Sequence, residues 1–204
     1  GGWDEIDGGN CPHAWRLLTG CRDVYTFTND GNGFRCFGAH TERMANSVKK
    51  LSGKLWTVPW PDAGGGGPMD LRVGCYDMFE RMCVWDDNNY IMACASKVSK
   101  DGSDRSAVDG IFDSHAYSVL ECINDAGGTQ FDMIKVRNPH GQTEFKSGMW
   151  TDDGEGWKKY PEVLKACKLA KADDGVFWME KDQFFLMFPT LFLCAKDMSE
   201  FTRQ

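Results

Sequence analysis

The stretch SHAYSVLECINDAGGTQFDMIKVRNP, residues 114–139, contains two strand-like segments separated by a turn rich in Asn, Asp and Gly. The residue types predict strands over 114–123 and 131–139. Two strands joined by so short a turn are expected to pair antiparallel. Because the start of one antiparallel strand lies beside the end of its partner, the sequence predicts that His115 and Asn138 are neighbours.

Outward from this hairpin, the chain alternates short helical and strand-like patterns. Apolar residues at spacings of three or four predict an amphipathic helix over 69–85. We therefore expect an α+β fold, in which helices pack around an antiparallel sheet. The other predicted elements are a helix at 11–20, a strand from Val24, a strand at 90–98, a helix near 160–170, and a strand, a helix and a strand within 174–196.

Residues 29–68 interrupt this pattern with glycine and proline and end in AGGGGP. Glycine-rich segments behave as flexible coil. The sequence therefore predicts a mobile surface insertion or variable loop over 29–68.

Composition excludes several classes of protein. The chain has 204 residues, of which 42% are hydrophobic and 26% charged, which is typical of a globular domain rather than a disordered or fibrous chain. The longest apolar stretch, 184–195, is well short of the roughly 20 residues of a membrane-spanning helix. A net charge of −7 disfavours nucleic acid as a partner.

The nine cysteines form no Cys-x-x-Cys pair, and their odd number rules out complete pairing within the chain. Several lie among apolar residues, which favours buried, reduced thiols over disulfides or a structural zinc site. Reduced thiols indicate a cytosolic setting.

A His–Asn pair has a defined chemistry. The amide oxygen of Asn138 accepts a hydrogen bond from one ring nitrogen of His115 and so fixes the tautomer. The other ring nitrogen then exchanges protons with a nucleophile. A histidine at the start of a strand is also common as a purely structural residue, so the pattern by itself leaves both roles open.

Four ordered motifs resemble the calpain family of cysteine proteases. They are SHAYSVLE (114–121), IKVRNPHG (134–141), EFKSGMWTDD (144–153) and DDGVFWMEKDQFFLMFPTLFLC (173–194). The segment from GGN to TG, 8–20, is similar to the start of the second half of the calpain protease core. The resemblance implies an antiparallel, barrel-like subdomain flanked by helices, over residues 1–197, with 198–204 beginning a linker.

The resemblance also implies roles for individual residues. His115 corresponds to the catalytic general base and acid, and Asn138 to its orienting partner. The nucleophilic cysteine of the family lies in a Gly-Asp-Cys-Trp context in the first half of the core, and this motif is absent here. The whole protein is then expected to be a calcium-dependent, intracellular endopeptidase acting on proteins or peptides. This chain is expected to be inactive without the Cys-bearing half.

Three residues bear on that assignment. Cys11 is followed by Pro12, where the family nucleophile is followed by Trp, so we interpret it as a small residue before a helix. His140 replaces the tryptophan that usually follows Asn-Pro, and its imidazole is smaller and titratable near neutral pH. Ser114 stands where many members have glycine.

The family also implies a calcium site. Its ligands correspond to Glu144, Asp152 and Asp174, with a backbone carbonyl near Ala172. Oxygen ligands from two acidic loops suit this cation. Val176, however, replaces a family glutamate, which predicts weak binding and leaves a solvated acidic loop as the alternative.

Aromatic residues crowd the last third of the chain. At this density they are expected in a core rather than around a ligand. The residues concerned are Trp150, Trp157, Trp178, Phe184, Phe185 and Phe188.

Two rival functions stay open on the sequence. One is a different papain-like hydrolase in which this chain is complete. The other is an inactive calpain-like module that regulates or binds proteins, an alternative favoured by His140 and Val176.

Overall fold

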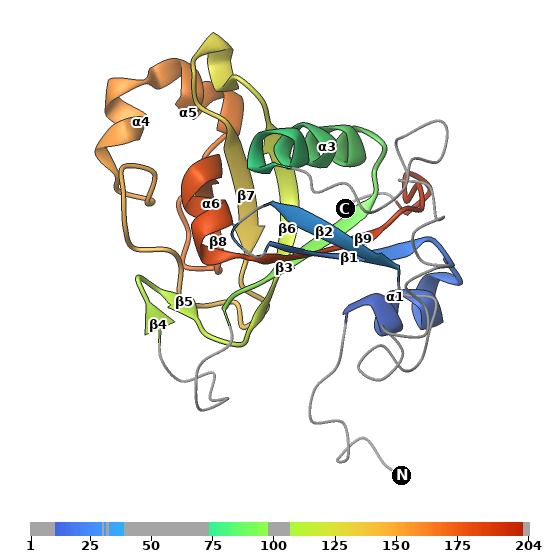
Figure 1. Cartoon of the computed structure of the whole chain (residues 1–204). Helices are drawn as coiled ribbons and strands as arrows, with labels where there is room; N and C mark the ends of the chain where they lie inside the picture. Colours follow the sequence, from blue (N-terminus) through green and yellow to red (C-terminus); the bar gives the residue numbers. More distant parts are fainter. Residues whose placement is uncertain (1–10, 30, 32, 39–73, 98–106, 202–204) are drawn as a thin grey trace.

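The computed structural model describes residues 11–29, 31, 33–38, 74–97 and 107–201. Their main feature is a seven-stranded sheet in the order β2-β1-β9-β3-β6-β7-β8, in which every neighbouring pair is antiparallel (Figure 1). The sheet is open, with β2 and β8 at its edges. The strands are β1 (Val24–Asn29), β2 (Phe34–Gly38), β3 (Ile91–Ala95), β6 (Ala116–Ile123), β7 (Met133–Arg137), β8 (Val176–Glu180) and β9 (Thr190–Cys194).

Short helices surround this sheet, so the predicted α+β class is confirmed. A separate two-stranded ribbon, β4 (Ala107–Val108) with β5 (Ile111–Phe112), precedes β6. The helices are α1 (Cys11–Thr19), α3 (Cys75–Asp87), the 3₁₀ turn η2 (Ala126–Gly128), α4 (Glu155–Lys159), α5 (Pro161–Cys167) and α6 (Lys181–Met187).

The predicted hairpin is the pair β6–β7. The two strands are antiparallel, from Ser118 opposite Arg137 to Ile123 opposite Met133. The turn between them contains η2. The tail likewise forms the predicted strand, helix and strand, as β8, α6 and β9.

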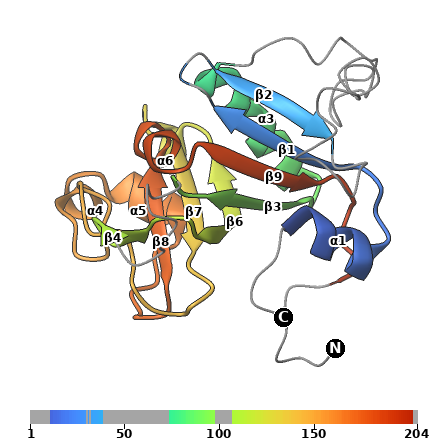
Figure 2. The ribbon, with the colours of Figure 1, turned by 60° about the horizontal axis from the view of Figure 1, so that its bottom comes forward.

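Alternation along the strands divides the core into layers. Tyr25 and Phe27 of β1 join a large cluster with α3 and α6, while Val24 faces the opposite side and packs near Trp15 of α1. Figures 1 and 2 show α3 and α1 on opposite sides of the β1–β9–β3 part of the sheet. Each face therefore has its own helical cover.

Strands β7 and β8 are buried on both faces. Val136 joins the large cluster, whereas Met133 and Trp178 join a second cluster with α4 and α5. This is why apolar residues follow one another directly within each strand, as in Met133–Ile134 and Phe177–Met179. All six aromatic residues predicted to form core are at most 7% exposed, namely Trp150, Trp157, Trp178, Phe184, Phe185 and Phe188.

Two segments differ from the expected pattern. Residues 34–38, inside the predicted variable loop, form the edge strand β2, and 39–68 of that loop lie outside the described residues. Residues 155–159, which precede the helix predicted near 160–170, form a separate short helix, α4. The indole of Trp157 explains this short helix, because it is buried and its Nε1 donates to the carbonyl of Thr151 at 2.7 Å.

The nine cysteines are all free thiols, as predicted, and four of them are buried. Across the part of the chain that the structure describes, no helix has the length and apolarity needed to span a membrane.

A buried ion pair ties the hairpin to the C-terminal helix. Asp132, just before β7, pairs with Lys181 at the start of α6 at 2.5 Å, with side chains 7% and 15% exposed. The other carboxylate oxygen of Asp132 accepts the backbone N–H of Asp125 in the β6–β7 turn at 3.0 Å. The Lys181 N–H donates to the Asp132 carbonyl at 2.9 Å. One carboxylate residue thus fixes three segments.

We expect Lys181→Met to lower the free energy of unfolding by about 3 kcal/mol, because it leaves the Asp132 carboxylate buried without its counter-charge. The control is Lys171→Met, which breaks the exposed pair with Asp153 and should cost less than about 1 kcal/mol. Urea denaturation of both variants measures the difference. Equal losses in the two variants would contradict this role for the buried pair.

Candidate active site

The structure brings His115 and Asn138 together at the open end of the β6–β7 hairpin. His115 directly precedes β6 and Asn138 directly follows β7. The ring nitrogen Nε2 of His115 lies 3.2 Å from Oδ1 of Asn138. The proximity of His115 and Asn138 that the hairpin predicts is therefore confirmed.

Hydrogen bonds fix which end of the Asn138 amide faces the imidazole. Nδ2 donates to the carbonyls of Gln142 at 2.7 Å and Thr143 at 3.1 Å, so Oδ1 must point the other way. Because Oδ1 only accepts, Nε2 of His115 carries the proton in their hydrogen bond. In the neutral ring the lone pair is then on Nδ1, which is the atom able to accept a proton.

The backbone of His115 is held by Ser96, a buried residue that follows β3. The hydroxyl of Ser96 donates to the carbonyl of Phe112 at 2.6 Å and accepts from the N–H of His115 at 3.1 Å. Its own N–H donates to the His115 carbonyl at 3.0 Å. Sequence patterns gave no signal for Ser96, because its partners are distant in sequence and its segment has only a generic strand pattern.

The residue before the histidine has an unusual backbone. Ser114 has φ of +55°, in the left-handed region that favours glycine. This conformation gives a physical reason for the glycine of many family members at this position. Ser114 adopts it while its N–H donates to the carbonyl of Lys97 at 2.8 Å.

Gly175, which precedes β8, supports Asn138 from the other side. Its carbonyl accepts the N–H of Asn138 at 2.8 Å, and its N–H donates to Oε1 of Glu144 at 3.2 Å. With φ of +77°, it approaches so closely that an added Cβ would lie 2.9 Å from the Asn138 carbonyl oxygen. Sequence patterns gave no signal for this contact.

Aromatic rings enclose the imidazole. The ring of His140 stacks on that of His115, with centroids 4.4 Å apart and planes inclined by 29°. Tyr117 contacts the His115 ring edge-on at 4.9 Å, and its hydroxyl accepts the N–H of Phe112 at 2.9 Å. His140 thus covers one face of the His115 ring.

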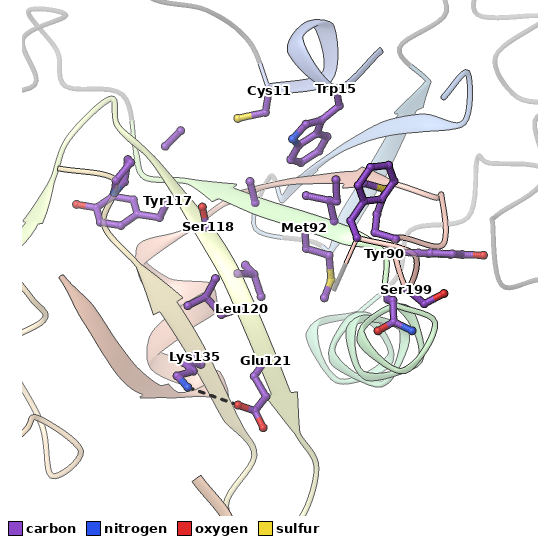
Figure 3. Close-up of a pocket in the computed structure, with 18 residues that line it drawn as sticks. Cys11, Trp15, Tyr90, Met92, Tyr117, Ser118, Leu120, Glu121, Lys135 and Ser199 are labelled. Atoms are coloured by element: carbon purple, nitrogen blue, oxygen red, sulfur yellow. Dashed lines mark ion pairs between the residues drawn. The ribbon is translucent and has the colours of Figure 1, made fainter. Parts of the chain in front are cut away.

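A groove of about 920 Å³ begins beside the pair (Figure 3). Ala116 and Pro139, the residues that follow His115 and Asn138, lie in its wall. The groove runs along β3 and β6 and is bounded by α1 on one side, where Trp15 points toward it, and by residues 198–201.

Burial disfavours the thiolate form of the cysteines. It raises the pKa of the Cys11 thiol, which opens α1, and brings that of Cys83 and of Cys167 to about 12. The same cause raises the thiol pKa of the others for which a shift is resolved, namely Cys36, Cys75, Cys94, Cys122 and Cys194. None of these thiols is activated as a nucleophile must be.

The acidic residues predicted as calcium ligands lie close together. Burial raises the pKa of Glu144, and the charges of Asp152 and Asp174 add to this effect. Burial likewise raises the pKa of Asp152, while an N–H from Ala172 opposes the shift. Glu144 and Asp152 line a pocket of about 450 Å³.

These groups do not form a ready metal site. Among the described residues, no three His, Cys, Asp or Glu side chains are arranged to hold a metal ion. Oδ1 of Asp174 accepts the N–H of Val176 at 2.9 Å, and Val176 itself offers no side-chain ligand. The donor set, as it stands, does not fit a calcium ion.

An imidazole with a fixed tautomer, held by a buried amide beside a groove, is an arrangement with the chemistry to exchange a proton at Nδ1. Comparison with known proteins gives the family: the sequence model described as calpain family cysteine protease matches residues 37–195. The chain belongs to this family, as the motifs indicated.

Individual relatives agree. Calpain clp-1 of Caenorhabditis elegans is 26% identical over 156 residues, or 74% of this chain and 20% of that protein. The calpain-1 catalytic subunit of Rattus norvegicus is 27% identical over 180 residues, 84% of this chain and 25% of the relative. Calpain-12 of Mus musculus is 35% identical over 97 residues, which are 46% of this chain and 13% of that protein. The match spans a quarter or less of each relative's length.

Replacing Gly175 by alanine should lower the free energy of unfolding by about 2 kcal/mol or more. The loss is expected because the backbone is left-handed and the added Cβ would clash with the Asn138 carbonyl. Gly141→Ala is the matched control. Gly141 has φ of +67°, but nothing lies within 4 Å of its added Cβ. Thermal unfolding distinguishes them, and a control as unstable as Gly175→Ala would show that the close approach is unimportant.

Proposed function

We propose that this chain supplies the His and Asn of a Cys–His–Asn site in a calpain-type cysteine endopeptidase. The observation that carries the proposal is the hydrogen bond from Nε2–H of His115 to the buried amide oxygen of Asn138. It leaves Nδ1 as the proton-exchanging atom, which is what a thiol nucleophile requires of its base. Membership of the family supports the same reaction.

In the proposed reaction, His115 takes the proton of the nucleophilic thiol, and the imidazolium stabilises the thiolate. The thiolate attacks the peptide carbonyl, and His115 returns the proton to the leaving amine as the C–N bond breaks. In the second half of the reaction, His115 takes a proton from a water molecule, whose oxygen attacks the acyl carbon. The C–S bond breaks to release the acid product and the thiolate, which regains the proton from His115. Asn138 keeps the ring in one orientation and one tautomer throughout.

We place the nucleophile in an upstream half of the core. The burial that raises the pKa of Cys11 argues against this thiol as the nucleophile. The apolar surface of α1 supports a contact with that upstream half, because Leu17 and Leu18 are 85% and 79% exposed. On this proposal, residues 1–197 form one subdomain, 198–204 begin a linker, and the whole protein acts on proteins or peptides inside the cell.

The catalytic test compares variants of the whole protein on a fluorogenic peptide. His115→Ala should abolish turnover, and Asn138→Ala should reduce kcat by about 10³-fold or more through loss of tautomer control. The 204-residue chain alone should be inactive and should resist labelling by a thiol-directed covalent protease inhibitor.

His13→Ala is the control for these measurements, because it removes an exposed imidazole of α1. Its kcat should match that of the unaltered protein. Normal activity in His115→Ala would refute the assigned base, and activity of the isolated chain that disappears in Cys11→Ala would make Cys11 the nucleophile.

A second candidate function is an inactive, protein-binding calpain-like module. The observation that favours it is His140 in the place of the family tryptophan. The same assay separates the two, because an inactive module gives no turnover in the unaltered protein.

We propose calcium as a weak regulator rather than a participant in any step. The mutual repulsion of Glu144 and Asp152 supports this, since a divalent cation would relieve it. A rearrangement of the two loops is needed first, because the donors do not converge.

Calorimetric titration of the chain with calcium chloride should therefore give weak binding, with a Kd of about 1 mM. Asp152→Asn should remove the heat signal, because it deletes a charged donor while keeping an acceptor for the Ala172 N–H. Asp87→Asn, on the exposed end of α3, is the control and should leave binding intact. No heat from the unaltered chain would favour a solvated acidic loop.

A further inference from the structure

His140 stacks on His115 at the open end of the β6–β7 hairpin. The last residues paired between these strands are Ser118 and Arg137, so both histidines lie beyond the ladder, His115 before β6 and His140 after β7. Their ring centroids are 4.4 Å apart and the ring planes are inclined by 29°.

A second contact fixes His140. Its backbone N–H donates to Oδ1 of Asn138 at 3.1 Å, the same oxygen that accepts from Nε2 of His115. The backbone of His140 and the imidazole of His115 thus share one buried acceptor, which places the Cα of His140 beside the His115 ring. Phe112 contacts both rings, at 6.1 Å and 6.2 Å, and closes the stack on a third side.

The charged residues on the segments around these rings are Asp113, Arg137 and Lys97. Asp113 follows Phe112 in the turn, Arg137 ends β7, and the Lys97 carbonyl accepts from Ser114. Their charges are of both signs. Within the described residues, the ring contacts of His140 are with Phe112 and His115, so its closest titratable neighbour is the proposed base.

We propose that His140 is a positioning residue, which holds the His115 ring against Asn138 and makes protonation of His115 depend on its own charge. Two neutral rings, or one neutral and one protonated ring, stack without repulsion. Two imidazolium rings at 4.4 Å repel each other, so the second proton binds less readily than the first. The inference rests on the proposed role of His115 as base.

The order of protonation follows from the hydrogen bonds. As the pH falls, the first proton favours His115, because a charged imidazolium strengthens its bond to Oδ1 of Asn138. Because the ring stacked on it is also ionisable, His115 is expected to titrate in two steps.

The test is an NMR titration of the imidazole signals in the 204-residue chain, with His140→Phe and His140→Gln as variants. In the unaltered chain, His115 and His140 should each show two steps. In both variants His115 should titrate in a single step. Phe, which stacks without charge, should preserve the downfield Nε2–H signal of His115, and Gln, which lacks a ring, should weaken it.

His13→Gln is the control, since it removes an imidazole for which no contact with the pair is observed among the described residues. The reciprocal variant, His115→Gln, should leave the remaining imidazole of the pair with a single titration step. If a His140 variant fails to fold, the titration of His115→Gln provides the test in its place.

A single step with one midpoint for His115 in all proteins would overturn the proposal, as would two steps that persist without His140. Neither result depends on peptidase activity. A failure here is therefore distinct from a failure of the proposed function.

Discussion

The site depends on the buried side-chain amide of Asn138. Both of its atoms are committed, Nδ2 to the carbonyls of Gln142 and Thr143 and Oδ1 to the His140 N–H and the His115 ring. An amide can satisfy donors and acceptors at once, whereas a carboxylate only accepts. Because the group is fully buried, leaving either end unpaired would be costly, and this cost fixes the orientation of the imidazole.

The layers of the fold keep that amide in place. It lies just beyond β7, where its residue's N–H donates to the carbonyl of Gly175 before β8. These two strands are covered by α3 and α6 on one face and by α4 and α5 on the other. The Asp132–Lys181 pair joins the far end of the same hairpin to α6. The His115–Asn138 end of the hairpin is thus supported by packing along its length, while the opposite face of β3 and β6 is left for the groove.

Much of this arrangement could be predicted from local sequence. The hairpin follows from two strand patterns and a short turn, and the His115–Asn138 contact follows from its pairing. Family resemblance predicted the carboxylate cluster around Glu144. That its side chains do not converge on a metal position could be seen only in the three-dimensional structure. Ser96 and Gly175 were missed because their roles arise from contacts between segments that are distant in the chain. The strand β2 was not predicted, because its segment lies among glycine residues that indicate a loop.

The residue that follows Asn138 has a consequence for chemical ageing. Asparagine most readily deamidates when the backbone nitrogen of the next residue attacks the side-chain carbonyl and closes a succinimide ring. Pro139 supplies no N–H for that cyclisation. Conversion of Asn138 to aspartate would replace the donor to two buried carbonyls with a charge. The Asn-Pro sequence therefore protects the least replaceable amide of the site from its commonest route of spontaneous decay.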